Sequence, residues 1–405
     1  MKRKPFSCLA SYLQMALLSL CLITAYGCGG TATKASPSKA DKEPLPLRDM
    51  MLGAAVMKAP PHEQAALANV SRNALEKKDH YRTVWYGTNR KPDADRPGYT
   101  DQRDNQVHYG KLTVFVPKSH QLGSIKSPHW YYRALGKDGL EVEWEEFVRF
   151  SKDDFVKDIR KELDKMQKDE KVILVYIHGY NVDFEKAAIR TAQLSEDLSI
   201  NGIAAFYSWP SKGDLTGYLA DEATVEASED YLYEFLYFIA DKQDEMGARN
   251  VHIIAHSMGN RALLRALNRL ETEKNGKHRF GKIFLAAPDV DSDVFKSLAR
   301  VYPKIASGTT LYISPKDVAM KGEAEFIHQD LRVGYPPVTI MEGIETVSFE
   351  GKTDLLTFGH LYYADPIVLC HLYEKIHGVT PTSDECKSIS KIKGKTRNGE
   401  YIIIK

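Results

Sequence analysis

Apolar positions follow two patterns along this chain, short continuous runs and longer stretches with helical spacing. The run Val172–Gly179 is almost continuously apolar, which is typical of a strand buried on both faces of a sheet. Beyond it, strand-like runs alternate regularly with amphipathic segments as far as Ile376. This alternation predicts an α/β fold, a mainly parallel sheet with helices on both faces.

The individual elements can be placed from the same patterns. Strands are expected at Thr83–Arg90, Lys111–Pro117, Val172–Gly179, Gly202–Pro210, Val251–Ser257, Lys282–Pro288, Thr309–Ser314 and Ile344–Glu350. Helices are expected between Lys152 and Lys168 and over Phe184–Leu198, Tyr218–Lys242, Gly259–Glu271, Asp291–Tyr302 and His360–Ile376. They make one predicted domain, residues 80–378, followed by a C-terminal tail, residues 379–405, whose basic segment Lys387–Arg397 reads as solvated.

The N-terminal region does not fit this domain. Residues 1–27 begin with basic residues and continue into a short apolar run, as a secretory signal peptide does. Cys28 follows at a site similar to a bacterial lipobox, so we expect a lipid anchor there, with ordinary secretion or a retained anchor as alternatives. Gly29, rather than aspartate, then favours the outer membrane of a bacterial cell envelope. Residues 28–49 read as a flexible tether and residues 50–79 as a helical extension.

Net charge and composition exclude one class of function. The 405 residues carry a formal net charge of +1, and no long segment carries a single sign. A nucleic-acid-binding protein would present a clustered basic face, so no nucleic-acid partner is expected. Oligomeric state is not predictable from these patterns.

Two cysteines remain downstream of Cys28. In an oxidising compartment Cys370 and Cys386 could form a disulfide that closes a short loop, and two unpaired thiols are the alternative.

Ser257 is the strongest candidate for a nucleophile. The motif Ala255-His256-Ser257-Met258-Gly259 directly follows an apolar strand and directly precedes a helix, which is the placement of a nucleophile elbow. Small residues two positions before and after the serine let the backbone close, although Ala255 stands where glycine is more common. The alternative, a serine that only caps the helix, is less consistent with this context.

A nucleophilic serine needs a histidine base and an acid that orients it, in the chain order serine, acid, histidine. His360 lies in a glycine-containing loop after the last strand, whereas His371 and His377 lie within a helix and lack the zincin spacing. Asp317 follows the strand just before the one that leads to His360, so we favour it as the acid. Asp289 and Asp291 are better suited to ordering a loop or capping the next helix.

An oxyanion hole requires backbone N–H groups that point at the developing charge. Met258, directly after the nucleophile, is expected to supply one. The loop after the strand at residues 172–179 is expected to supply the other, from Tyr180 or Asn181, because Gly179 allows a sharp turn. His178 is expected to order this loop.

The ordered motifs together resemble a known family. The segments WYGTNRKPD, YGKLTVFVP, IHGYN, FYSWPSKG, AHSMGNRALL, LAAPDVDSDVF, SPKDVAM and FGHLYY are similar to those of bacterial esterase/lipase-like α/β hydrolases of unknown function. The resemblance covers roughly Tyr81 to Ile376 and implies an α/β-hydrolase fold with Ser257, Asp317 and His360 as the catalytic triad.

These features predict a serine hydrolase that cleaves an acyl ester through an acyl-enzyme intermediate, without metal or organic cofactor. Thioesters and amides are less favoured substrates, and a lipid substrate fits a membrane-anchored enzyme. If neutral His360 is the base, the rate should rise through the pH range in which imidazole deprotonates. The alternative is an envelope binding or interaction protein on a hydrolase scaffold that does not turn over.

Overall fold

The computed structural model describes residues 80–117, 120–124, 139–213, 217–274, 276–322, 330–352 and 359–405. The predicted signal peptide, the Cys28 anchor, the tether and the helical extension lie outside these ranges. The described residues all belong to one compact unit, Glu76–Lys405. None of the helices in this part of the chain is long and apolar enough to cross a membrane.

A central sheet of eleven strands organises the described residues, and its middle is parallel. The parallel strands are β1 (His80–Pro92), β5 (Ile203–Ser208), β4 (Val172–Ile177), β6 (Asn250–His256), β7 (Phe280–Ala286), β8 (Ala306–Ile313), β9 (Ile344–Phe349) and β11 (Gly399–Ile404), in that spatial order. Antiparallel strands extend both edges, β2 (Tyr99–Val116) and β3 (Glu141–Phe150) beside β1, and β10 (Lys391–Thr396) beside β11. The predicted α/β architecture is therefore confirmed.

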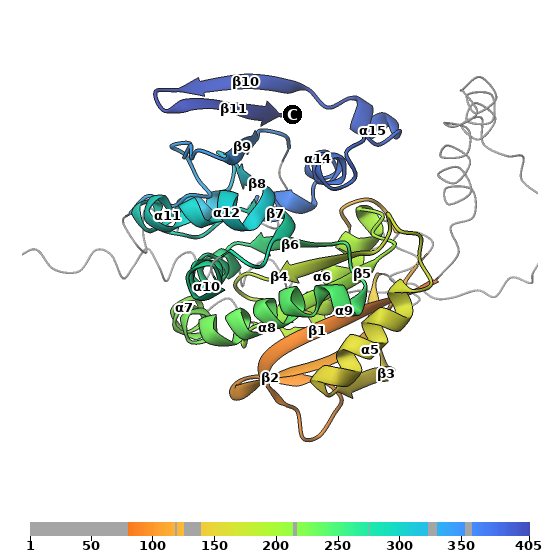
Figure 1. The fold of residues 1–405 in the computed structure, drawn as a ribbon. Coiled ribbons are helices and arrows are strands. Elements are labelled where there is room, and N and C mark those ends of the chain that lie inside the picture. The colour runs from red at the N-terminus through yellow and green to blue at the C-terminus, as the bar shows by residue number, and fades with distance from the viewer. Residues whose placement is uncertain are drawn as a thin grey trace, which may run out of the picture. The chain divides into compact units, whose positions relative to one another are not determined.

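Helices cover both faces of the sheet (Figure 1). One apolar cluster packs the sheet against helices α5 (Lys152–Leu163), α8 (Glu229–Asp241), α10 (Gly259–Lys274), α11 (Ser292–Leu298) and α12 (Tyr302–Ile305). The other packs it against α6 (Phe184–Asp197) and α14 (Pro366–His377). Successive residues of β6 alternate between the clusters, Ile253 in the first and Ile254 in the second. This burial on both faces explains why the central strands are almost continuously apolar.

One long helix expected over Tyr218–Lys242 is two helices in the structure. Helix α7 (Tyr218–Ala227) ends at Ser228, and α8 begins at Glu229. The Ser228 hydroxyl donates to the carbonyl of Thr224 and accepts a hydrogen bond from Asn89 on β1. Serine side chains that bond back to the preceding turn bend helices, so this contact accounts for the break.

The expectation that the domain ends at residue 378 and is followed by a tail, residues 379–405, is wrong. This segment forms the short helix α15 (Asp384–Lys387) and the hairpin β10–β11, which extends the sheet beyond β9 (Figure 1). The apolar end of β11, Ile402–Ile404, pairs with β9, and the lysines of β10 lie on the outer edge, where they discourage pairing with other strands. The Asn398-Gly399 pair is a hairpin turn signal that the charge of the segment obscured.

Candidate active site

Ser257 lies in a strained turn between β6 and α10. Its φ angle is +51°, in the left-handed region that residues other than glycine rarely adopt. A Cβ atom on Gly259 would lie 2.4 Å from the His178 carbonyl oxygen, so this position requires glycine. Ala255, where glycine is more common, is fully buried in the core.

Hydrogen bonds hold this turn in place. The Ser257 N–H donates to the Ala286 carbonyl at 2.9 Å, and the Ser257 carbonyl accepts from the Asp289 N–H at 3.2 Å. The buried amide of Asn260 donates to the carbonyls of Ala255 and Ser257 at 3.0 and 3.1 Å. The turn is thereby tied to the end of β7 and to the first turn of α10.

Asp317 and His360 are brought together by the loops that follow β8 and β9. His360 Nδ1 lies 2.8 Å from Asp317 Oδ2. The other carboxylate oxygen, Oδ1, accepts the Met320 N–H at 3.0 Å at the start of α13 (Val318–Gly322). Asp317 is fully buried, whereas 16% of the His360 side chain is exposed. With Nδ1–H donated to the carboxylate, the tautomer leaves Nε2 as the basic nitrogen.

His256 connects the His360 loop to the elbow. Its Nε2 lies 3.3 Å from the His360 carbonyl oxygen, and the two ring centroids are 4.8 Å apart. Burial, followed by the nearby His360, holds the pKa of His256 well below its usual range, so the ring is neutral. This contact places His360 beside the residue that directly precedes Ser257.

The backbone predicted to form the oxyanion hole lies against the elbow. A Cβ atom on Gly179 would lie 2.7 Å from the Ser257 Cβ, so the chain at Gly179 approaches the nucleophile closely. The Met258 N–H has no acceptor among the described residues, which suits an oxyanion donor. The Asn181 N–H is directed to Asp221 Oδ2 at 3.4 Å.

The alternative acids have other partners. Asp289 is fully buried and lies 2.8 Å from Arg261 Nη2 and 3.7 Å from Arg332 Nε. Burial by itself raises the pKa of Asp289, but the two guanidinium groups outweigh it and lower that pKa. Asp291 caps helix α11 by accepting the N–H groups of Asp293 and Val294. Both carboxylates are therefore committed to structural roles.

The helical histidines also have structural partners. His371 Nδ1 lies 2.8 Å from the Tyr312 hydroxyl in the core, and His377 Nε2 lies 2.8 Å from the Leu198 carbonyl oxygen. Within the described residues there is no group of three or more His, Cys, Asp or Glu side chains that could hold a metal ion.

Residues 151–373, more than half of the chain, match the model of a protein family described as "Alpha/beta hydrolase of unknown function (DUF900)". The chain belongs to this family. No curated protein matches the chain.

Solved structures similar to this α/β hydrolase include several esterases. The esterase Est22 is 13% identical over 89% of this chain and 96% of its own, with a TM-score of 0.34. A Pyrobaculum calidifontis esterase is 10% identical over 82% of this chain and 92% of its own, with a TM-score of 0.33.

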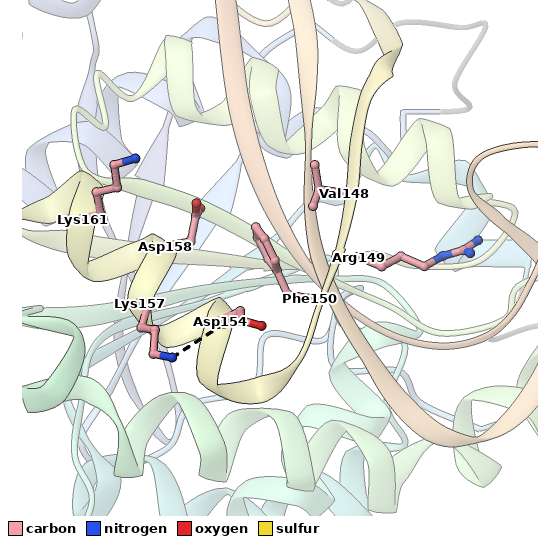
Figure 2. A pocket seen from close by; sticks show the side chains of 7 residues that line it. All are labelled: Val148, Arg149, Phe150, Asp154, Lys157, Asp158 and Lys161. Carbon is pink, nitrogen blue, oxygen red and sulfur yellow. Dashed lines mark ion pairs between the residues drawn. The ribbon is translucent and has the colours of Figure 1, made fainter.

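A pocket of about 380 Å³ lies elsewhere on this α/β hydrolase, between β3 and α5 (Figure 2). Its lining is mostly charged and includes the ion pair Lys157–Asp154 at 3.7 Å. Because β3 is the edge strand beyond β1 and β2, this pocket is remote from the elbow after β6. None of the triad candidates lines it, so it is separate from the candidate active site.

Several buried polar residues around the site are not predicted from the sequence. They are Arg90 at the end of β1, Ser208 at the end of β5, Asp221 on α7 and Asn260 on α10. The position of Arg90 and Ser208 is a usable signal, because a charged or polar residue that ends a buried parallel strand lies at the active-site edge of the sheet.

Proposed function

We propose that this α/β hydrolase cleaves acyl esters with Ser257 as the nucleophile, His360 as the base and Asp317 as the residue that orients His360. The observation that carries the proposal is the 2.8 Å contact between His360 Nδ1 and Asp317 Oδ2. It is supported by the strained Ser257 turn and by the packing of His360 against His256, the neighbour of the serine.

The proposed reaction follows from the roles of these groups. Ser257 Oγ attacks the acyl carbonyl carbon, and its proton passes to His360 Nε2. The negative charge on the carbonyl oxygen is stabilised by the N–H groups of Met258 and Tyr180. The intermediate expels the alcohol, which takes the proton from His360 and leaves an acyl-serine. A water molecule, deprotonated by His360, then releases the acid and regenerates Ser257.

An apolar acyl group is the substrate we favour. Large exposed apolar side chains directly adjoin, in the sequence, Asp317 and two residues that contact Asp289. Leu219 follows Tyr218, which donates to Asp289, and it is 69% exposed. Val318 follows Asp317 and is 57% exposed, and Leu331 precedes Arg332 and is 52% exposed. Exposed apolar residues at these positions would suit an aliphatic or lipid acyl chain better than a charged substrate.

Covalent labelling tests the chemistry. We expect a fluorophosphonate probe to label the wild-type protein and the Ser297→Ala variant, which lacks only an exposed serine of α11. The Ser257→Ala variant should not be labelled and should not hydrolyse a chain-length series of p-nitrophenyl esters. Absence of labelling in the wild-type protein, or labelling that persists in Ser257→Ala, would instead favour a non-catalytic binding protein of the envelope.

We also propose that the protein is attached to the bacterial cell envelope, at the outer membrane, by a lipid on Cys28. The disulfide between Cys370 and Cys386 supports an oxidising compartment, because such bonds persist outside the cytosol. Incorporation of labelled palmitate into the wild-type protein, and its loss together with membrane association in Cys28→Ala, is the expected result. A protein that stays with the membrane fraction in Cys28→Ala would contradict the lipid anchor.

A further inference from the structure

Arg90 is a fully buried arginine at the end of β1, and all three nitrogens of its guanidinium group donate hydrogen bonds. Nε donates to Ser208 Oγ at 2.8 Å, and Nη2 donates to the Val182 carbonyl at 2.8 Å. Nη1 donates to the carbonyls of Thr100 and Ser211 at 3.3 and 3.1 Å. Burial lowers the pKa of Arg90 to about 10, and Asp183 and Asp221 oppose this shift, so the group stays charged at neutral pH. A buried charge with four separate acceptors is costly unless each contact is made, so it indicates a specific task.

A chain of hydrogen bonds leads from Arg90 to the loop after β4, residues 178–182, which contains Tyr180 and is called the oxyanion loop below. Guanidinium nitrogens only donate, so Ser208 Oγ accepts from Arg90 and has its own proton left to donate. His178 Nε2 lies 3.1 Å from that hydroxyl, and His178 Nδ1 lies 2.8 Å from the Gly179 carbonyl oxygen. Because the Gly179 carbonyl oxygen can only accept, the proton of His178 resides on Nδ1, and Nε2 of the neutral ring accepts from the Ser208 hydroxyl. Burial, followed by the nearby Arg90, lowers the pKa of His178 to about 3, so the ring is neutral.

The carbonyl that His178 holds belongs to the peptide group whose N–H is that of Tyr180. In a trans peptide the C=O and N–H groups point in opposite directions. Fixing the Gly179 carbonyl toward the buried His178 ring therefore fixes the Tyr180 N–H away from that ring. The same peptide group follows Gly179, whose Cα packs against Ser257. The hydrogen bond from His178 to the Gly179 carbonyl thus determines the direction of the Tyr180 N–H, which belongs to the same peptide group and is the proposed oxyanion donor.

The C-terminal side of the loop is held by the same group of residues. The Val182 N–H donates to Ser211 Oγ at 3.1 Å, while the Val182 carbonyl accepts from Arg90. Ser211 Oγ in turn donates to Asp221 Oδ2 at 2.5 Å, the oxygen that also accepts from Asn181 N–H. Arg90 therefore contacts the loop directly at Val182 and indirectly at Gly179, on either side of Tyr180.

We propose that Arg90 is a positioning residue that acts through Ser208 and His178 to direct the Tyr180 N–H at the oxyanion. This role rests on the proposed ester hydrolysis, but it concerns residues on β1 and β5 that touch no substrate. Breaking this chain of hydrogen bonds should weaken stabilisation of the transition state but not binding of the substrate. The Tyr180 N–H group remains present, and only its direction is no longer fixed.

The test compares Ser208→Ala with Ser195→Ala. Both remove the hydroxyl of a fully buried serine, but Ser195 donates to the Ile200 carbonyl near the start of β5, at the opposite end of that strand from Ser208. Steady-state kinetics on the preferred p-nitrophenyl ester are measured together with inhibition by an alkyl trifluoromethyl ketone, whose adduct with serine carries an oxyanion. Arg90→Lys keeps the charge but cannot reach four acceptors, and it provides a second variant.

We expect kcat of Ser208→Ala to fall about tenfold with KM within twofold of wild type, and Ki of the ketone to rise by the same factor. Arg90→Lys should show the same pattern, and Ser195→Ala should keep wild-type kcat and Ki while losing a similar amount of thermal stability. Wild-type kcat and Ki in Ser208→Ala, or a rise in KM with kcat unchanged, would overturn the positioning role of Arg90. Neither result would contradict the proposed catalytic triad. Ester hydrolysis that survives Ser257→Ala would overturn the proposed function instead, and the positioning role with it.

Discussion

His360 Nδ1 and Asp317 Oδ2 are 2.8 Å apart although 43 residues separate them in the chain. They meet because β8 and β9 are adjacent parallel strands, so the loops that follow them leave the sheet at the same edge. Asp317 is anchored by its second role as the cap of α13, which fixes one carboxylate oxygen and leaves the other for the histidine.

Replacing Asp317 with asparagine should disable the base without disrupting the fold. The amide can still accept the Met320 N–H, but it can present an NH₂ group to His360 and favour the wrong tautomer. We expect kcat to fall about 10³- to 10⁴-fold with little change in KM. Asp291→Asn is the matched control, because asparagine caps helix α11 as well as aspartate does. Ester hydrolysis by Asp317→Asn at the wild-type rate would rule out Asp317 as the orienting acid.

Asp289 should matter for stability rather than for proton transfer. Its neutralisation in Asp289→Asn removes the counterion of the buried Arg332 and one of the two carboxylates, Asp289 and Glu222, that pair with the part-buried Arg261. Removing one partner of a buried ion pair typically costs about 3–5 kcal/mol, so we expect the free energy of unfolding in urea to fall by about 3 kcal/mol. Asp293→Asn, which alters an exposed pair with Lys296, should leave it nearly unchanged. An equally small effect in both variants would show that the Asp289 network is not stabilising.

The catalytic candidates were predictable because each follows a strand with a strong apolar pattern. Ser257, Asp317 and His360 come after three such runs. Chain order allows either Asp289 or Asp317 as the acid, and the position of Asp317 after the strand just before the one that leads to His360 separated the two. Arg90 and Ser208 were not predicted, because their roles depend on hydrogen bonds to Gly179 and Val182 across neighbouring strands. Local pattern shows where a strand ends, but it does not show which backbone groups of other loops lie there.

The C-terminal hairpin was not predicted for a different physical reason. The lysines of β10 alternate with other residues and read as a solvated segment, yet they occupy the outer edge of a sheet, where charge is favourable. The pairing that makes the hairpin part of the domain is between Ile402–Ile404 and β9. Such a pairing between segments distant in sequence is determined by tertiary contacts rather than by local periodicity.

Gly179 should tolerate no side chain. A Cβ atom there would lie 2.7 Å from the Ser257 Cβ and 3.0 Å from His256 Nδ1, so Gly179→Ala must displace the oxyanion loop or the nucleophile. We expect at least about a 100-fold loss of kcat, comparable to the removal of an oxyanion donor, together with a loss of stability of about 1–3 kcal/mol. Gly322→Ala is the matched control, because nothing lies within 4 Å of its Cβ position. Crystal structures or kinetics that show an unperturbed site in Gly179→Ala would contradict this packing.

The disulfide should stabilise the C-terminal part of the domain. Cys370 on α14 and Cys386 on α15 are 16 residues apart in sequence, and their Cα atoms are 5.4 Å apart. Closing a loop of this length stabilises a protein by about 3 kcal/mol through the entropy of the unfolded chain. We expect the Cys370→Ser, Cys386→Ser double variant to unfold at a lower urea concentration than the oxidised wild type. The reduced wild type should resemble the double variant, and a reductant should not affect the latter.

Mild acid should destabilise the protein through its buried neutral histidines. Burial lowers the pKa of His178 to about 3 and those of His252 and His371 to about 4. In the unfolded chain histidine has a pKa of about 6.5, so below that pH the unfolded state binds protons that the folded state does not. The stabilisation is therefore complete above about pH 6.5 and is lost as the pH falls toward 4, by up to about 1.4 kcal/mol per pH unit for each histidine.

Several carboxyl groups oppose this trend, because burial raises the pKa of Glu185, Asp221, Glu229 and Asp365. Burial raises the pKa of Glu229 to about 7, so the folded state takes up one proton early and offsets one histidine. The remaining buried histidines still dominate. Urea unfolding at pH 8, 7, 6 and 5 should show a free energy of unfolding that is flat above pH 7 and falls below about pH 6.5. His371→Gln retains a partner for the Tyr312 hydroxyl, removes one titrating group and should give a shallower decline. A free energy of unfolding that is constant from pH 8 to pH 5 in the wild type would show that these histidines are not kept neutral by the fold.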